Sequence, residues 1–136
     1  TLFSTGQQKD GLNITVYSFG FKYGAPEDSD IVMDVRYLPN PYWVEELRKQ
    51  TGLDEDVRKF VMFRPESEEF VAKWRSLLDT LIPGYISEGK QHLAISIGCT
   101  GGQHRSVCIA EDTGNYLKSK GYRVSITHRD IDRANR

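Results

Sequence analysis

The sequence has few cysteines, no long hydrophobic run and almost no net charge. Only Cys99 and Cys108 occur among 136 residues, too few for the disulfide framework of a small secreted protein, so we expect a reduced, cytoplasmic setting. No apolar run approaches the roughly 20 residues that cross a bilayer, so we expect no membrane contact. A formal net charge of -1 excludes attraction of the whole chain to nucleic acid, and any basic patch must be local.

Signatures of several enzyme classes are missing as well. No G-x-x-x-x-G-K-[ST] pattern occurs, so ATP or GTP hydrolysis cannot be assigned to this chain. His92 has no Cys, His or carboxylate neighbour at ligand spacing, and we predict neither a metal nor another cofactor. The chain also lacks an initiator methionine. We therefore expect residues 1–12 to be a polar linker remnant of a longer protein.

Length and composition fit one globular domain. A hydrophobic fraction of 38% and a charged fraction of 27% are ordinary values for such a domain. Residue patterns predict strands at 13–19, 30–38, 93–97 and 123–128, and helices from Asp54 to Arg64, from about Phe70 to a stop at Pro83-Gly84, and from about Ser106 to Lys120-Gly121. Strands that alternate with helices indicate an α/β fold with a mainly parallel sheet covered by helices. Ligands are expected at the carboxyl ends of its strands.

The loop between the third strand and the last helix has the composition of an anion site. Its glycines allow backbone N–H groups and the helix N-terminus to converge on a phosphate. An arginine fork can hold two phosphate oxygens, which a lysine cannot do. A bare glycine turn would merely join strand to helix, but the added hydroxyls, histidine and arginine favour a phosphate site. Its residues are Gly98, Cys99, Thr100, Gly101, Gly102, Gln103, His104, Arg105 and Ser106.

Three blocks of this sequence, at 18–24, 34–41 and 98–106, resemble the signature blocks of the RapZ C-terminal domain family, in the family's order. The resemblance covers residues 13–129 and leaves 130–136 as a charged tail. It implies a fold similar to a phosphofructokinase subdomain. It also implies a regulatory, non-catalytic domain that senses the amino-sugar phosphate glucosamine-6-phosphate. In some members this domain binds small regulatory RNAs and presents them to an endoribonuclease, and the family is homo-oligomeric.

The second block extends the expected ligand site. Asp34 and Arg36 stand two apart at a strand end, hence on one face, and alone they would suggest only a salt-bridged strand end. Within a block that resembles RapZ, we assign them to the ligand site together with Asn40 and Tyr42. RNA-binding members have histidine at the position of Tyr42, which leaves the preferred sugar open. Arg64 can direct a guanidinium into the same cleft, although a helix-end arginine is commonly just a C-terminal charge.

Basic residues near the C-terminus are the candidates for RNA binding. Asp130 and Asp132 interrupt the basic tail, so RNA binding has weaker support than ligand binding. Any such binding is expected to be electrostatic and sensitive to salt. The candidates are Lys22, Lys118, Lys120, Arg123, Arg129, Arg133 and Arg136.

An enzymatic alternative uses the same glycine loop. Cys99 to Ser106 satisfies C-x5-R-S, the phosphate loop of cysteine-dependent phosphatases, in which a thiolate activated at a helix N-terminus attacks phosphorus. Those enzymes usually have histidine where Gly98 stands, and they need an acid such as Asp34 on another loop. The two other blocks match RapZ and no phosphatase, so a binding module is favoured. A third interpretation is a domain that serves mainly for oligomerisation.

Overall fold

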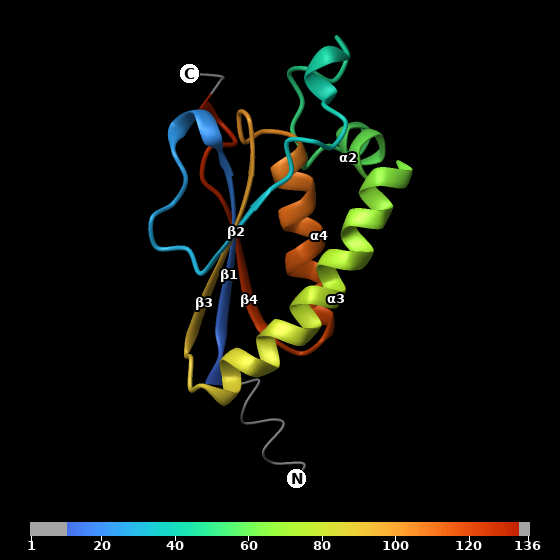
Figure 1. Cartoon of the computed structure of the whole chain (residues 1–136). Helices are drawn as coiled ribbons and strands as arrows, with labels where there is room; N and C mark the ends of the chain where they lie inside the picture. Colours follow the sequence, from blue (N-terminus) through green and yellow to red (C-terminus); the bar gives the residue numbers. More distant parts are fainter. Residues whose placement is uncertain (1–10, 134–136) are drawn as a thin grey trace.

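The computed structural model describes residues 11–133, which form a four-stranded, all-parallel sheet with helices packed against it (Figure 1). This confirms the predicted α/β class. The order of strands across the sheet is β2-β3-β1-β4. The strands are β1 (Asn13–Gly20), β2 (Ile31–Asp34), β3 (His92–Cys99) and β4 (Arg123–His128).

The two longest helices, α3 (Pro65–Ser87) and α4 (Arg105–Ser119), lie on one face of the sheet (Figure 1). Trp74 Nε1 of α3 donates to Thr113 Oγ1 of α4 at 3.0 Å and joins the two. The shorter α2 (Glu55–Met62) packs beside them, and 3-10 turns follow β1 (η1, Phe21–Tyr23) and β2 (η2, Pro41–Trp43). The core between sheet and helices includes Ile14, Val16, Leu78, Ile95, Ile97 and Ile109.

No helix among residues 11–133 combines the length and apolarity needed to cross a membrane. On the sheet face opposite the helices, the loop after η1 returns to β2, and Ser29 Oγ lies 2.5 Å from Ser96 Oγ of β3. Leu12, which we had assigned to the linker, is instead fully buried in the core. Residues 1–10 and Arg136 lie outside the described residues.

The second strand is shorter than the predicted 30–38, because the chain turns directly after Asp34. The Asp34 carboxylate accepts the backbone N–H of Arg36 at 2.8 Å, a local side-chain bond that competes with strand pairing. Val35 N still donates to Gly98 O of β3 at 2.9 Å, and residues 36–38 leave the sheet. The backbone carbonyls of Arg36 and Leu38 become acceptors for a side chain from another element.

The predicted stop of α3 at Pro83-Gly84 is wrong, since the helix continues to Ser87. An interior proline removes one backbone hydrogen bond and costs about 3 kcal/mol. Here Ile82 is buried, and Tyr85 and Ile86 pack against the core beyond the proline. Burial of such side chains contributes about 1.5–3 kcal/mol each, which offsets the loss.

Because all four strands are parallel, their carboxyl ends share one edge of the sheet, and the segments that follow them meet there. Lys22 N, after β1, donates to Thr100 O, after β3, at 3.2 Å. Gly52 N donates to Gln103 O at 2.8 Å, and Arg129 N, after β4, donates to Ser18 O at 3.0 Å. This edge is where a parallel sheet presents its ligand site.

Candidate functional site

A cavity of about 380 Å³ opens at the carboxyl edge, and we call it the loop cavity. Its volume is typical of small-molecule sites. Segments after three different strands form its walls: η1 after β1, the turn and η2 after β2, and the glycine loop after β3. The lining residues are Lys22, Asn40, Tyr42, Trp43, Cys99, Thr100, Gly101, Gln103, His104 and Arg105.

Seven residues of the predicted ligand set come together in the loop cavity: Asn40, Tyr42, Cys99, Thr100, Gly101, His104 and Arg105. Gln103, a member of the predicted glycine loop, lines it as well, and so does Lys22, which was assigned to RNA binding. Trp43 was missed. The signal for Trp43 was an aromatic pair, Tyr42-Trp43, next to a proline turn at a strand end.

Arg105 is the first residue of α4, and its side chain is 96% buried, with a relative exposure of 4%. Nη1 donates to the carbonyls of Arg36 and Leu38, the second at 3.2 Å. Nη2 lies 3.5 Å from Thr100 Oγ1, the guanidinium also contacts the Cys99 side chain, and Nε has no hydrogen-bond partner among residues 11–133. No carboxylate in this described part of the chain forms an ion pair with Arg105, and burial lowers the pKa of its guanidinium. A buried charge of this kind is stabilised by an anion.

The glycine loop packs so closely against the end of β1 that neither Gly102 nor Gly20 has room for a side chain. Gly102 has φ +81°, and a Cβ there would lie 2.6 Å from Gly20 N. A Cβ on Gly20 would lie 2.5 Å from the carbonyl carbon of Gly101. Within residues 11–133 the amides of Gly101, Gly102 and Gln103 have no protein acceptor. The loop thus keeps a closely fitted main chain with N–H groups left for solvent or a ligand.

His104 and Cys99 supply the side chains at the base of the loop. His104 Nε2 lies 3.2 Å from the carbonyl of Arg48, and because a carbonyl only accepts, Nε2 carries the proton. Burial lowers the pKa of His104, which favours the neutral ring at pH 7. Cys99 is a free, buried thiol whose Sγ donates to Ser106 Oγ at 3.2 Å. An anion in the loop cavity would raise the pKa of His104 again.

Two aromatic side chains form the outer wall of the loop cavity. Trp43 is 76% exposed and Tyr42 is 48% exposed, and their ring centroids lie 5.3 Å apart in an edge-to-face contact. The Asn40 side chain accepts from Tyr42 N at 3.0 Å and fixes the start of η2. Arg48 lies over the Tyr42 ring and donates to the Tyr42 carbonyl. Two aromatic rings, roughly perpendicular to each other, are therefore held next to Arg105 and the glycine loop.

Asp34 and Arg36, both assigned to the ligand site, do not line the loop cavity. They form an exposed ion pair at 2.7 Å, and the Arg36 guanidinium stacks on Phe21. Hydrogen bonding to Arg36 keeps the pKa of Asp34 below its usual value. Arg64 also lies outside the cavity lining, where it donates to the Phe60 carbonyl. Gly98, Gly102 and Ser106, which were also predicted, are not among the lining residues.

The predicted RNA-binding residues do not form one patch. Strand β4 begins at Arg123 and ends at His128, so residues at its two ends are about 17 Å apart. The group at the carboxyl edge, which we call the cavity-side group, is Lys22, Arg129 and Arg133. The far-end group, at the C-terminus of α4 and the start of β4, is Lys118, Lys120 and Arg123.

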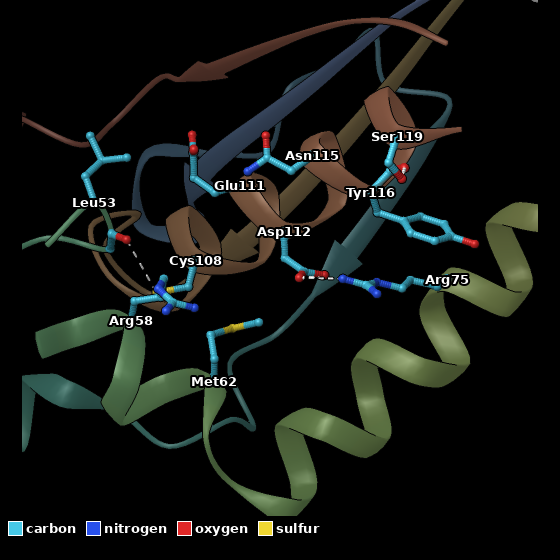
Figure 2. Close-up of a pocket in the computed structure, with 11 residues that line it drawn as sticks. Leu53, Arg58, Met62, Arg75, Cys108, Glu111, Asp112, Asn115, Tyr116 and Ser119 are labelled. Carbon is cyan, nitrogen blue, oxygen red and sulfur yellow. Dashed lines mark hydrogen bonds and ion pairs between the residues drawn. The ribbon is translucent and has the colours of Figure 1, made fainter. Parts of the chain in front are cut away.

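A second cavity, of about 420 Å³, lies on the outer face of α4, next to α2 and α3 (Figure 2). Its cations already have partners in the protein. Arg58 pairs with Glu55 at 2.9 Å, and Arg75 pairs with Asp112 at 2.7 Å. Glu111 also faces this cavity. Two carboxylates in its lining disfavour a phosphate, so the loop cavity is the better anion site.

A family model described as the RapZ C-terminal domain matches residues 12–132. Curated relatives named nucleotide-binding protein include one from Acetivibrio thermocellus, 50% identical over 99% of this chain and 46% of the relative. Others come from Limosilactobacillus reuteri, 55% identical over 98% of this chain and 46% of the relative, and from Clostridioides difficile, 54% identical over 95% and 45%. The chain thus spans a little under half the length of the curated relatives it matches.

Proposed function

This chain belongs to the RapZ C-terminal domain family, and from this we propose that it is a regulatory, non-catalytic domain that senses a phosphorylated amino sugar. The ligand that the family resemblance implies is glucosamine-6-phosphate. The observation that carries the proposal is the buried guanidinium of Arg105, which lines the loop cavity and has no carboxylate partner among residues 11–133. A phosphate would supply the missing negative charge.

The surroundings of Arg105 support a phosphate monoester in particular. The Nη2 group has a long contact to Thr100, at 3.5 Å, and Nε has no hydrogen-bond partner among residues 11–133, so both can donate to phosphate oxygens. The free amides of the loop can donate to other oxygens, and Lys22 adds a positive charge to the same lining. The exposed ring of Trp43 offers a surface for the sugar part of the ligand.

Calorimetric titration with glucosamine-6-phosphate tests this proposal. Binding should stabilise the folded chain and raise its Tm as ligand concentration increases. Glucosamine, which lacks the phosphate, is the matched control and should give no heat at the same concentration. Heat from glucosamine equal to that from its phosphate, or silence of both at millimolar concentration, would remove the anion site from the proposal.

The phosphatase alternative rests on Cys99, whose Sγ lies 3.2 Å from Ser106 Oγ. Two observations weigh against it, and both concern Asp34, the conceivable acid. Asp34 does not line the loop cavity. It is also paired with Arg36, and hydrogen bonding to Arg36 keeps the pKa of the Asp34 carboxyl low and the group ionised. An ionised carboxylate cannot protonate a leaving group.

We therefore expect no turnover of a generic aryl phosphate by the parent chain. The comparison is with Cys99→Ser, which removes the thiolate and keeps a small polar side chain. The burial of Cys108 raises its pKa to about 12, so it cannot substitute for Cys99 as a nucleophile at neutral pH. Steady hydrolysis that disappears in Cys99→Ser would establish the phosphatase. Slow hydrolysis that is equal in both proteins indicates a contaminant.

We also propose RNA, presented to an endoribonuclease, as a partner of a homo-oligomeric protein that contains this domain in the cytoplasm. The basic residues form two groups, the cavity-side group and the far-end group, and the contacts of each group suggest which surface RNA uses. Arg129 and Arg133 both pair with the buried carboxylate of Asp130, which reduces their net charge. In the far-end group, Lys120 Nζ lies 4.0 Å from Asp79 in an exposed pair and also lies over the Tyr116 ring. An exposed pair neutralises a cation less than the buried carboxylate of Asp130 does. We therefore expect the far-end group to contribute more to RNA affinity.

Filter binding of structured RNA over a salt series measures this contribution. Each lost phosphate contact should reduce the slope of log affinity against log salt by about 0.7 to 0.9. The triple change Lys118→Glu, Lys120→Glu and Arg123→Glu should therefore flatten the slope and weaken binding. Lys73→Glu on the exposed side of α3 is the control for a change in total charge. Equal affinity of the triple variant and the parent would exclude this surface.

A further inference from the structure

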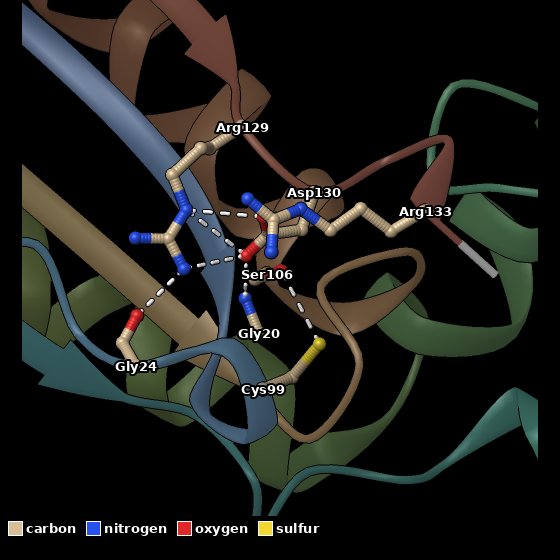
Figure 3. Close-up of polar contacts among 7 residues, drawn as sticks. All are labelled: Gly20, Gly24, Cys99, Ser106, Arg129, Asp130 and Arg133. Atoms are coloured by element: carbon tan, nitrogen blue, oxygen red, sulfur yellow. Dashed lines mark hydrogen bonds and ion pairs between the residues drawn. The ribbon is translucent and has the colours of Figure 1, made fainter.

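Asp130 is a carboxylate without any exposed surface, the single such Asp or Glu in the described part of the chain. It accepts the backbone N–H of Gly20 at 2.8 Å and pairs with Arg129 at 2.8 Å and with Arg133 at 2.9 Å (Figure 3). Burial opposes its ionisation, but these donors outweigh burial and hold the pKa of Asp130 below its usual value. A buried carboxylate with three donors is a fixed structural anion.

Asp130 also touches the glycine loop. A Cβ on Gly102 would lie 2.9 Å from Asp130 Cβ and 2.6 Å from Gly20 N, so these three residues are in mutual contact. The next residue of the same turn, Ile131, accepts from the Gln103 side chain at 3.3 Å. The turn at 129–133 thus packs against the loop at Gly102 and is hydrogen-bonded to it through the Gln103 side chain.

The same turn also holds the opposite wall of the loop cavity. Arg129 Nη2 donates to the Gly24 carbonyl at 2.6 Å, as Figure 3 shows. The segment from Gly20 to Gly24 contains Lys22, whose side chain lines the cavity and whose N–H donates to Thr100 O. Both ends of this segment are therefore tied to Asp130, one directly and the other through Arg129.

We propose that Asp130 is a positioning residue of the anion site: its carboxylate fixes the contact between Gly20 and the glycine loop and so aligns the loop amides and Lys22. This inference rests on the proposed function. Asp130 does not line the cavity and does not contact the ligand. Displacement of groups that must converge on one small anion lowers affinity even when each group is retained.

The test is Asp130→Asn, which keeps the size of the side chain and removes its charge. Titration of the folded variant with glucosamine-6-phosphate should show affinity about tenfold lower than that of the parent. Asp30→Asn is the matched control. Asp30 also accepts a strand amide, Ala94 N at 2.8 Å, and pairs with Lys90, but near the start of β3. It should lose stability and keep the parent affinity.

Amide NMR spectra without ligand separate this inference from the proposed function. In Asp130→Asn, the amide signals of Gly20, Gly101 and Gly102 should shift or broaden, whereas in Asp30→Asn they should not. If the parent binds no phosphosugar, the proposed function fails, and these signals alone decide the role of Asp130.

Should Asp130→Asn not fold, Asp130→Glu keeps the charge and moves the carboxylate by one methylene. Parent-like affinity and loop signals in either folded variant, or equal losses in Asp30→Asn, would overturn the inference.

Discussion

Arg105→Ala should reduce the affinity for glucosamine-6-phosphate by about 100-fold, because it removes the cation that the ligand would neutralise. Hydrogen bonds to charged groups contribute about 1.5–3 kcal/mol, and 100-fold corresponds to about 2.7 kcal/mol. The same change leaves the buried carbonyls of Arg36 and Leu38 without a donor. We therefore also expect the free energy of unfolding to fall by about 2–4 kcal/mol. Calorimetry and urea denaturation measure the two effects separately.

Arg105→Lys is the matched variant for this experiment. It keeps the positive charge but replaces a planar fork by a point charge, so it should bind more weakly than the parent and more tightly than Arg105→Ala. Arg64→Ala removes a helix-end arginine outside the loop cavity and should bind like the parent. Unchanged affinity in a folded Arg105→Ala protein would refute the phosphate site.

Gly102→Ala should destabilise the domain by about 2–5 kcal/mol, because the added methyl group meets both a conformational and a steric obstacle. The φ of +81° at Gly102 disfavours any Cβ by about 1–2 kcal/mol. The added Cβ would also lie 2.6 Å from Gly20 N and 2.9 Å from Asp130 Cβ, and the neighbouring main chain must move. Such overpacking costs a further 1–3 kcal/mol or so. Urea denaturation with an unchanged m-value measures the sum.

Gly89→Ala separates these two contributions. Gly89 has a similar φ of +85°, and nothing lies within 4 Å of an added Cβ. Its substitution should therefore cost only the conformational part, about 1–2 kcal/mol. Similar losses at Gly89 and Gly102 would show that the close packing of the loop against Gly20 has no energetic weight.

Local sequence patterns were sufficient to predict most strands and helices. They failed to predict where an element ends when that end depends on a contact with a distant part of the chain. The β-branched residues of β1 and the apolar stripe of α4 each indicated their element, because burial of that pattern forms it. Nothing near Pro83 indicated that α3 continues, since the reason is the packing of Tyr85 and Ile86 on a core made by other segments. The early end of β2 depends on one side-chain bond from Asp34, which competes with strand pairing over a few residues.

Only part of the candidate site could be predicted from the sequence, for the same reason. The glycine loop was recognisable because its residues are consecutive and each supplies a donor or a turn. The acceptors of Arg105 Nη1 were not predictable, because they are backbone carbonyls exposed by the end of β2. Asp130 read as a tail residue, since only the register that pairs Ser18 of β1 with His128 of β4 brings it next to Gly20. Sequence patterns do not specify a parallel register.

The positions of the two tryptophans give this protein a pair of optical probes. Trp74 is 2% exposed in the core, whereas Trp43 is 76% exposed at the wall of the loop cavity. A buried indole emits at shorter wavelength than a hydrated one, so the fluorescence spectrum of the folded chain contains two separable components. Iodide in solution quenches the component from Trp43 and spares the one from Trp74. Ligand occupancy and loss of the fold can therefore be followed in one cuvette, without any label.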